Sequence, residues 1–264
     1  MTAQQPLLEI ENLTISFGGL LALQGLNLSV FDGEIVGLIG PNGAGKTTVF
    51  NCISRFYTPT HGAIRFKGRD VTRCAPHHVI RHGIARTFQN VELFRSMTTL
   101  DNLLVGQHVT TPDHMLANGL RLPGVRRREA ILRARADEVL HLLDLRPYRD
   151  RVVSTLPFGV QKTIELARAL VSRPALLLLD EPAAGADTHE TAELIDTIRR
   201  IRATFDVSML LVEHDMAMVM DLCERLYVLD FGKLIATGPP ADIQSDPAVI
   251  EAYLGERDVA GVGL

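Results

Sequence analysis

The sequence has little or none of three things that point to particular classes of protein: tryptophan, cysteine and net positive charge. Its 264 residues include no tryptophan and only three cysteines, at positions 52, 74 and 223. Cysteines this few and scattered are typical of a protein in the reducing cytosol. The formal net charge of −4 gives no basic surface of the kind that nucleic-acid binding normally needs, so we expect no nucleic-acid partner.

Long hydrophobic runs are also missing. A helix that crosses a bilayer needs about 20 predominantly apolar residues, and the longest apolar runs here are short segments such as 175–179 and 209–212. Residues 1–6 have neither a basic start nor a long apolar stretch, so no secretory signal is visible. We therefore expect a soluble protein in the cytoplasm, attached to a membrane only through a partner.

The composition is otherwise ordinary for a globular protein, with 46% hydrophobic and 22% charged residues. Alternating apolar and polar residues predict strands near both ends of the chain, whereas the pattern from about 90 to 170 is helical. A helix face is expected over 194–205. Strands that alternate with helices favour a mainly parallel α/β core, into which residues 90–170 are inserted. The strands are predicted at 8–17, 26–30, 63–66, 175–179, 208–212, 225–229 and 233–236.

A glycine-rich loop lies between a predicted strand at 34–39 and a predicted helix that begins at Thr47. It has the form G-x-x-x-x-G-K-[ST], in which backbone N–H groups and a helix N-terminus surround phosphate oxygens. Lys46 is expected to reach the β- and γ-phosphates, and Thr47 to offer its hydroxyl to Mg²⁺. The predicted ATP-binding residues of the loop are Gly40, Pro41, Asn42, Gly43, Ala44, Gly45, Lys46, Thr47 and Thr48.

Two carboxylates follow the apolar run 175–179. Asp180 and Glu181 would lie at the carboxyl end of a buried strand, where open α/β sheets bind ligands. Asp180 suits a Mg²⁺ site, because Mg²⁺ binds few carboxylates and keeps several of its waters. Glu181 is placed to polarise a water molecule aimed at the γ-phosphate.

The order of these motifs along the chain, with Phe17 before the loop and His214 after the carboxylates, resembles the ATP-binding cassette of ABC transporters. The resemblance covers essentially the whole chain. It implies a P-loop NTPase of the α/β class with a RecA-like core, an N-terminal antiparallel β subdomain and an inserted α-helical subdomain. One domain would span 1–264, with the core and β subdomain at 1–89 and 171–240, the helical subdomain at 90–170 and a tail at 241–264.

The same resemblance implies roles for six residues outside the loop. Phe17 would stack on adenine, and Gln89 would contact Mg²⁺ and sense the γ-phosphate. Asp187 would meet an opposing subunit. Glu181 and His214 would be the catalytic residues, with His214 in the place of the family's γ-phosphate histidine. The metal ligands would be Thr47, Gln89 and Asp180.

The stretch 156–161 departs from the usual family signature Leu-Ser-Gly-Gly-Gln, because it reads Leu-Pro-Phe-Gly-Val-Gln. In the family this segment begins a helix and clamps the γ-phosphate bound to the opposite subunit of a head-to-tail dimer. Phe158, Gly159 and Gln161 would make those contacts here. Pro157 suits a first helical turn but lacks a hydroxyl and an N–H group. We expect a working clamp with one contact missing.

The stretches 83–94, 97–105, 181–185 and 246–255 are similar to the ATPases of branched-chain (hydrophobic) amino acid importers. That family implies ATP and Mg²⁺ as ligands and a second ATPase, either identical or a paralogue. It also implies two membrane permeases, contacted near residues 90–110, and an extracytoplasmic binding protein. The chain would then lie on the cytoplasmic face of the plasma membrane. Its relatives also import urea, short amides or aromatic breakdown products, so related small amides stay possible cargo.

Other interpretations are less favoured. A soluble ABC ATPase of translation or DNA repair usually carries two cassettes or a long coiled coil, for which 264 residues leave no room. A nucleotide-regulated scaffold without turnover is disfavoured by the intact Glu181 and His214. Cys74, His78 and His82 have helical spacing but no other sign of a metal site. The arginines between 121 and 135 are balanced by Glu129, Asp137 and Glu138, which favours a solvated face.

Overall fold

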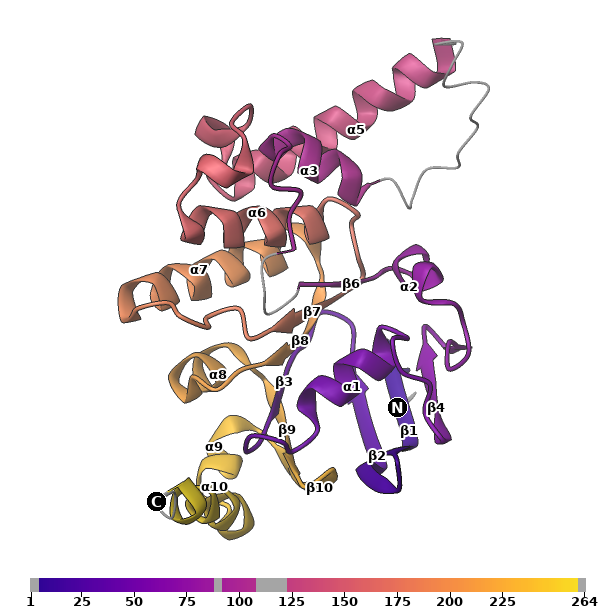
Figure 1. Ribbon diagram of the computed structural model, residues 1–264, viewed down its shortest axis with the longest axis vertical. Coiled ribbons are helices and arrows are strands. Elements are labelled where there is room, and N and C mark those ends of the chain that lie inside the picture. The colour runs from indigo at the N-terminus through magenta and orange to yellow at the C-terminus, as the bar shows by residue number, and fades with distance from the viewer. Residues whose placement is uncertain (1–4, 88–91, 108–122, 261–264) are drawn as a thin grey trace.

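The structure is a computed structural model that describes residues 5–87, 92–107 and 123–260. Two sheets organise the described residues, with helices layered against them (Figure 1). The smaller sheet has the strand order β2-β1-β4-β5 and is antiparallel. Its strands are β1 Leu8–Phe17, β2 Leu20–Val30, β4 His61–Phe66 and β5 Arg69–Asp70. Buried and exposed side chains alternate along β1, as expected for a strand with one solvated face.

The larger sheet has the order β10-β9-β3-β8-β7-β6. Its strands are β3 Ile35–Ile39, β6 Ile84–Arg86, β7 Leu176–Asp180, β8 Ser208–Val212, β9 Arg225–Asp230 and β10 Lys233–Gly238. All pairs are parallel except β9 with β10, which form a hairpin. Every residue of β3, β7 and β8 is buried, so these mainly apolar strands are covered on both faces.

The helices fall into two groups. Figure 1 shows α3, α5 and α6 together at one end of the molecule, with α7 between α6 and the sheet. This end contains α3 Thr99–Gly106, α5 Pro123–Leu142, α6 Phe158–Leu170 and the short 3₁₀ helices Arg146–Tyr148 and Val153–Thr155. The others are α1 Lys46–Ile53, α2 Pro76–His82, α7 Thr188–Phe205, α8 Met216–Leu222, α9 Pro240–Gln244 and α10 Pro247–Ala260.

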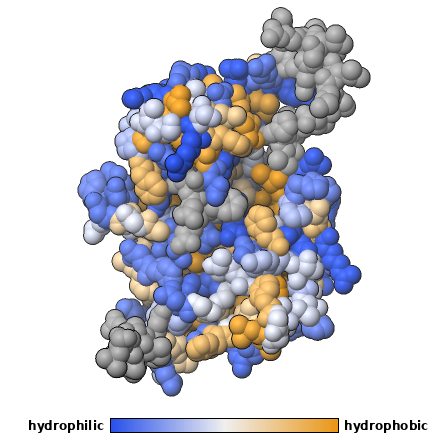
Figure 2. Space-filling view, in the orientation of Figure 1, coloured by the Kyte–Doolittle hydropathy of each residue, from blue (hydrophilic) through white to orange (hydrophobic). Residues whose placement is uncertain are grey.

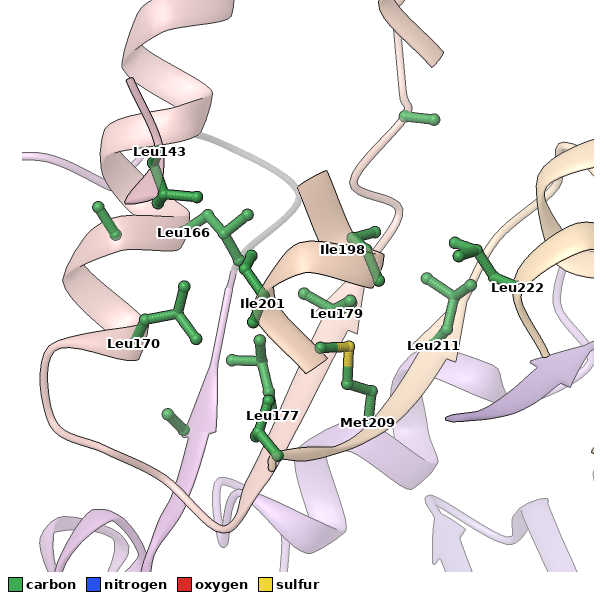
Figure 3. Packing of buried hydrophobic residues seen from close by; sticks show 14 of the residues in the cluster. Leu143, Leu166, Leu170, Leu177, Leu179, Ile198, Ile201, Met209, Leu211 and Leu222 are labelled. Carbon is green, nitrogen blue, oxygen red and sulfur yellow. The ribbon is translucent and has the colours of Figure 1, made fainter. Parts of the chain in front are cut away.

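The period of two along the buried strands divides the core between the two faces of the larger sheet. Leu177 and Leu179 of β7 point to the face covered by α6, α7 and α8, whereas Leu176 and Leu178 point to the face covered by α1 and the smaller sheet. Figure 3 shows the first face, where side chains from β7 and β8 meet those of α6 and α7. The same cluster continues into α3 and α5, so the helical end shares its core with the sheet.

The α/β class, the antiparallel N-terminal sheet and the helical insertion are confirmed. The predicted start of the second strand at residue 26 is wrong, because β2 begins at Leu20. Exposed Leu20 and Leu21 and irregular register hide the alternation there. Two short strands, β5 and β6, were not predicted, because two or three residues show no period.

Among the residues that the structure describes, no helix combines the length and the apolar character needed to cross a membrane. Figure 2 shows hydrophobic and hydrophilic residues interspersed over the visible face.

Candidate active site

The glycine-rich loop connects β3 to α1, and its shape depends on glycine at two positions. Gly40 and Gly45 have φ angles of 146° and 107°, which side-chain-bearing residues rarely adopt. A Cβ atom at position 40 would lie 2.0 Å from the carbonyl oxygen of Leu229, and one at position 45 would lie 2.9 Å from that of Ala22. Neighbouring strands β9 and β2 therefore pack directly against the loop backbone and hold its curve.

Lys46 is the first residue of α1 and is buried. Its Nζ atom donates to the carbonyl oxygens of Gly40 and Pro41, at 2.6 and 2.9 Å, so the ammonium group lies within the curve of the loop. Thr47 is exposed beside it. A lysine charge, a helix N-terminus and a free threonine hydroxyl next to one another suit a phosphate with its metal ion.

The carboxyl ends of β3, β8 and β7 lie side by side, which brings the loop and both catalytic candidates to one edge of the sheet. Residue 180 pairs with residue 212 in the parallel register of β7 and β8. Glu181 and His214 follow those two positions, and Glu181 Oε1 lies 2.9 Å from His214 Nε2. The structure therefore brings together the two residues that the sequence predicts as catalytic.

The backbone of Glu181 adopts a left-handed conformation, with φ of 48°. Such a conformation costs a non-glycine residue on the order of 1–3 kcal/mol and persists only where the surroundings impose it. Here the Glu181 N–H donates to the carbonyl oxygen of Val212 at 2.9 Å. The turn directs the Glu181 side chain, 16% exposed, toward the partly exposed His214.

Asp180 is buried and forms an ion pair that the sequence did not predict. Its Oδ2 atom accepts from Arg86 Nη2 at 2.7 Å, and both side chains are less than a tenth exposed. Arg86 Nη1 also donates to Asn51 of α1 at 2.8 Å. Arg86 thus joins the end of β6, the helix after the loop and the end of β7. A charged residue at the end of a short strand was the available signal, but strand β6 itself was not predicted.

Glu213 is a second functional candidate that the sequence did not single out. It is only 4% exposed and follows the last residue of β8. Its carboxylate accepts from the backbone N–H groups of Ala183 and His214. A carboxylate between an apolar strand and His214 was the visible signal for this residue.

Phe17 ends strand β1 and is 45% exposed, so its ring is free to stack on a base. The ring packs edge-on against Tyr57, with 5.0 Å between ring centroids. Tyr57 is also exposed and was not predicted as part of this surface.

The signature stretch begins helix α6 as predicted, with Pro157 at the N-cap position. Phe158 is 60% exposed and Gly159 is exposed beside it. Gln161 instead turns back, and its Nε2 atom donates to the Leu156 carbonyl oxygen at 2.8 Å. A groove of ≈1250 Å³ runs from this terminus to Glu181, between α6 and α7.

Asp187 caps helix α7. Its side chain accepts from the N–H groups of His189 and Glu190, and the Glu190 carboxylate accepts from the Asp187 N–H in return. This capping box orders the segment after Glu181. A predicted contact between Asp187 and an opposing subunit is not visible in one chain.

Gln89 lies outside the residues that the structure describes. The spacing of Cys74, His78 and His82 does not place all three on one helix, because α2 begins at Pro76. Burial raises the pKa of the Cys74 thiol, which disfavours the thiolate that a metal requires. Within the described ranges, no group of three or more histidine, cysteine or acidic side chains is arranged to hold a metal ion.

The chain is similar to known families and proteins. Residues 23–184 match the family described as ABC transporter, and residues 233–259 match the family described as branched-chain amino acid ATP-binding cassette transporter. The chain is 44% identical over 252 residues to the high-affinity branched-chain amino acid transport ATP-binding protein BraF of Pseudomonas aeruginosa, covering 96% of this chain and 99% of that one. The corresponding protein LivG of Escherichia coli K12 gives the same identity and coverage.

Solved structures with similar folds are also ATP-binding cassettes. A nucleotide-free cassette from an ABC transporter superposes with a TM-score of 0.82 at 31% identity, covering 94% of this chain and 99% of that one. The ADP conformation of an ATP-binding cassette gives the same TM-score and identity, with 95% and 99% coverage.

Proposed function

The chain belongs to the ABC transporter family of ATP-binding cassettes, among the branched-chain amino acid transport ATP-binding proteins, and we propose that it hydrolyses ATP to drive import of branched-chain or other hydrophobic amino acids, or related small amides. The observation that carries the proposed chemistry is the Glu181–His214 pair, 2.9 Å apart, at the sheet edge that also bears the glycine-rich loop. The match of residues 233–259 and the names of the relatives support the proposed cargo.

ATP binding is assigned to the loop and to Phe17. The backbone N–H groups of residues 40–48 and the Lys46 ammonium would hold the phosphates, and the exposed Phe17 ring would stack on adenine. Burial of the Lys46 stem keeps its charge inside the loop. These contacts bind and orient the nucleotide and do not by themselves hydrolyse it.

Hydrolysis is assigned to Glu181 and His214. The Glu181 carboxylate would accept a hydrogen bond from the attacking water and take up its proton as the water oxygen bonds to the γ-phosphorus. The bond between that phosphorus and the oxygen that bridges it to the β-phosphate would break in the same step, so that ADP leaves. His214 Nε2, within hydrogen-bond distance of Glu181 Oε1, would orient that carboxylate and face the γ-phosphate. Because His214 is 45% exposed, it is accessible to a nucleotide outside the sheet edge.

Mg²⁺ is proposed as the metal, with Thr47, Asp180 and Gln89 as the residues that would hold it, directly or through water. The donors that the structure describes fit, because a hydroxyl and a carboxylate are the hard oxygen ligands that Mg²⁺ prefers. Arg86 occupies Oδ2 of Asp180 and leaves Oδ1 for a metal-bound water. When bound, Mg²⁺ would neutralise part of the phosphate charge.

The assembly is proposed as a head-to-tail pair of ATPase subunits on two membrane permeases, fed by an extracytoplasmic binding protein. Exposed Phe158 and Gly159 support the contact with a second ATPase, because they lie at a helix N-terminus that the described residues leave open to solvent. We propose that the segment around 90–110 contacts the permeases on the cytoplasmic face of the membrane. The proposed division is a core at 1–89 and 171–240, a helical part at 90–170 and a tail at 241–264.

Co-purification followed by ligand screening tests this function. The tagged chain should bring down membrane permeases, and the binding protein encoded or purified with them should bind leucine, isoleucine or valine. Ribosomes or DNA in place of permeases would point to the soluble ABC ATPases instead. A binding protein that selects urea or another small amide would keep the transporter and change its cargo.

A further inference from the structure

Residues 182–184, directly after Glu181, are held from two sides by charged groups. Two turn-like hydrogen bonds order this segment internally: Ala184 N–H donates to the Glu181 carbonyl oxygen and Ala186 N–H to that of Ala183, at 3.1 and 2.9 Å. The remaining backbone polar groups of the segment form hydrogen bonds with one negatively charged and one positively charged side chain. Those side chains come from parts of the chain that are distant in sequence.

Glu213 holds the segment from the sheet side. Its Oε1 atom accepts from the Ala183 N–H at 2.6 Å. Its Oε2 atom accepts from the N–H groups of His214 and Asp215, at 2.9 and 3.3 Å. One buried carboxylate therefore connects the backbone next to Glu181 with the backbone of its partner His214. Hydrogen bonds that end on a charged group are about twice as strong as neutral ones.

Lys162 holds the same segment from the helical side. Its Nζ atom donates to the carbonyl oxygens of Pro182, at 3.5 Å, and of Ala184. The same ammonium group lies 5.4 Å from the centre of the Phe158 ring, one helical turn away in α6. Phe158 is the exposed first residue of α6. Lys162 thus touches both the backbone after Glu181 and the helix terminus proposed to meet a second subunit.

We propose that Lys162 and Glu213 are positioning residues that hold residues 182–184 between them, and that Lys162 makes the placement of Glu181 depend on the position of helix α6. The inference rests on the proposed function, because a shift of α6 can report nucleotide binding only if that helix meets nucleotide on another subunit. Neither residue touches the reacting atoms. Both act on the left-handed turn at Glu181, which its own sequence does not favour.

The physical basis is the small tolerance of catalysis to displacement. A misplacement of about 1 Å can lower a rate by about 100-fold, even when the group that moves is far from the chemistry. Lys162 connects α6, in the helical end, to a segment that Glu213 fixes to the sheet. Movement of α6 relative to the sheet would therefore displace the backbone of residues 182–184, and through it the side chain of Glu181.

Steady-state kinetics of the complete transporter complex, with ATP and Mg²⁺, test the proposal. The informative variants are Lys162→Met, which removes the charge but keeps the stem, and Lys162→Arg, which keeps the charge. Lys67→Met is the matched control, because Lys67 also lies over a phenylalanine ring, 5.7 Å from the centre of Phe66, but belongs to the surface near β4. We expect Lys162→Met to lower kcat by roughly 10- to 100-fold at unchanged KM for ATP. Lys162→Arg should restore most of the rate, and Lys67→Met should match the wild type.

A double-mutant cycle with Glu213→Gln separates positioning from independent effects. If both residues hold one segment, the double variant should be only slightly slower than the slower single variant. Multiplicative losses would overturn the proposal, as would a wild-type rate for Lys162→Met or a raised KM at normal kcat. If Glu213→Gln does not fold, the two Lys162 variants decide alone. A wild-type complex that hydrolyses no ATP would instead refute the proposed function.

Discussion

The glycine-rich loop and the N-terminus of α6 are both glycine-bearing helix starts, yet one is enclosed by the fold and the other is open. A Cβ atom at Gly40 would collide with strand β9, whereas one at Gly159 would have as its nearest neighbour the Glu190 carboxylate, 3.9 Å away. Lys46 is buried in the first site, and Phe158 is 60% exposed in the second. The glycine-rich loop is enclosed by its own chain, whereas the N-terminus of α6 has room for a partner.

The difference is the one expected if the proposed site is divided between two chains. The groups proposed to bind and hydrolyse ATP lie at the sheet edge, where parallel strands and closely packed glycines fix them. The groups proposed to complete the site lie at the N-terminus of α6, and this helix is anchored in the core by residues farther along it, such as Ile164 and Leu170. Substitutions in the two regions should therefore differ in what they change.

The largest expected effect is on hydrolysis and comes from the sheet edge. Glu181→Gln keeps the shape of the side chain but removes its capacity to take a proton. Hydrolysis should fall by roughly 10²–10⁴-fold while ATP still binds. Turnover and nucleotide affinity, measured on the same preparation, check this. Near-normal turnover would remove Glu181 from the catalytic role.

The next largest effect is on stability and differs between Gly40 and Gly159. Gly40→Ala should lower the free energy of unfolding by about 3 kcal/mol and abolish ATP binding, because the new Cβ would lie 2.0 Å from a backbone oxygen. Gly159→Ala should leave stability unchanged or raise it by up to about 1 kcal/mol, because alanine favours a helix. Urea denaturation of both variants gives the comparison. Equal losses would show that α6 begins in an equally closed environment.

A smaller effect is expected at the aromatic surface. Phe17→Ala should weaken ATP binding by roughly 3- to 10-fold, because a stacked aromatic pair contributes about 0.5–1.5 kcal/mol. The loss of affinity for GTP depends on how strongly guanine stacks on the ring, whereas the phosphate contacts are the same for both nucleotides. Equilibrium titration of ATP, compared with inorganic triphosphate, isolates the base. An equal loss for triphosphate would place Phe17 outside the base contact.

An effect of similar size is expected at Pro157, which tests the altered signature. Pro157→Ser adds a hydroxyl and an N–H group at the start of α6, and one hydrogen bond to a charged group contributes about 1.5–3 kcal/mol. The isolated chain should bind ATP as before, whereas the complete complex should change in affinity or turnover by about tenfold. No change in the complex would count against a clamp role at this position.

Much of this architecture could be predicted because its signals are local. The loop 40–48 carries its turn, its charge and its helix start within nine residues. The carboxylates 180–181 follow an apolar strand directly, so their place at the sheet edge needed only the strand itself. Family resemblance gave Glu181 and His214 as separate catalytic candidates, whereas their 2.9 Å contact depends on the parallel register of β7 and β8 and was not predicted.

The parts that could not be predicted are contacts between distant segments. Arg86 and Asp180 are separated by 94 residues, and Ala183 and Glu213 by 30. The sequence around Arg86 or Glu213 does not show whether the charged side chain is buried against a partner or exposed to solvent, because that depends on the order of the strands. Tyr57 joins Phe17 for the same reason, since a loop after α1 returns it to the end of β1.

Photo-cross-linking from position 158 tests the central claim, a site divided between two subunits, most directly. p-Benzoylphenylalanine would replace Phe158 in the complete complex, with Glu181→Gln present to retain ATP, and mass spectrometry would identify the attached peptide. The account predicts attachment to the glycine-rich loop of a second ATPase subunit, dependent on ATP. Attachment only within the same chain, with or without ATP, would contradict it.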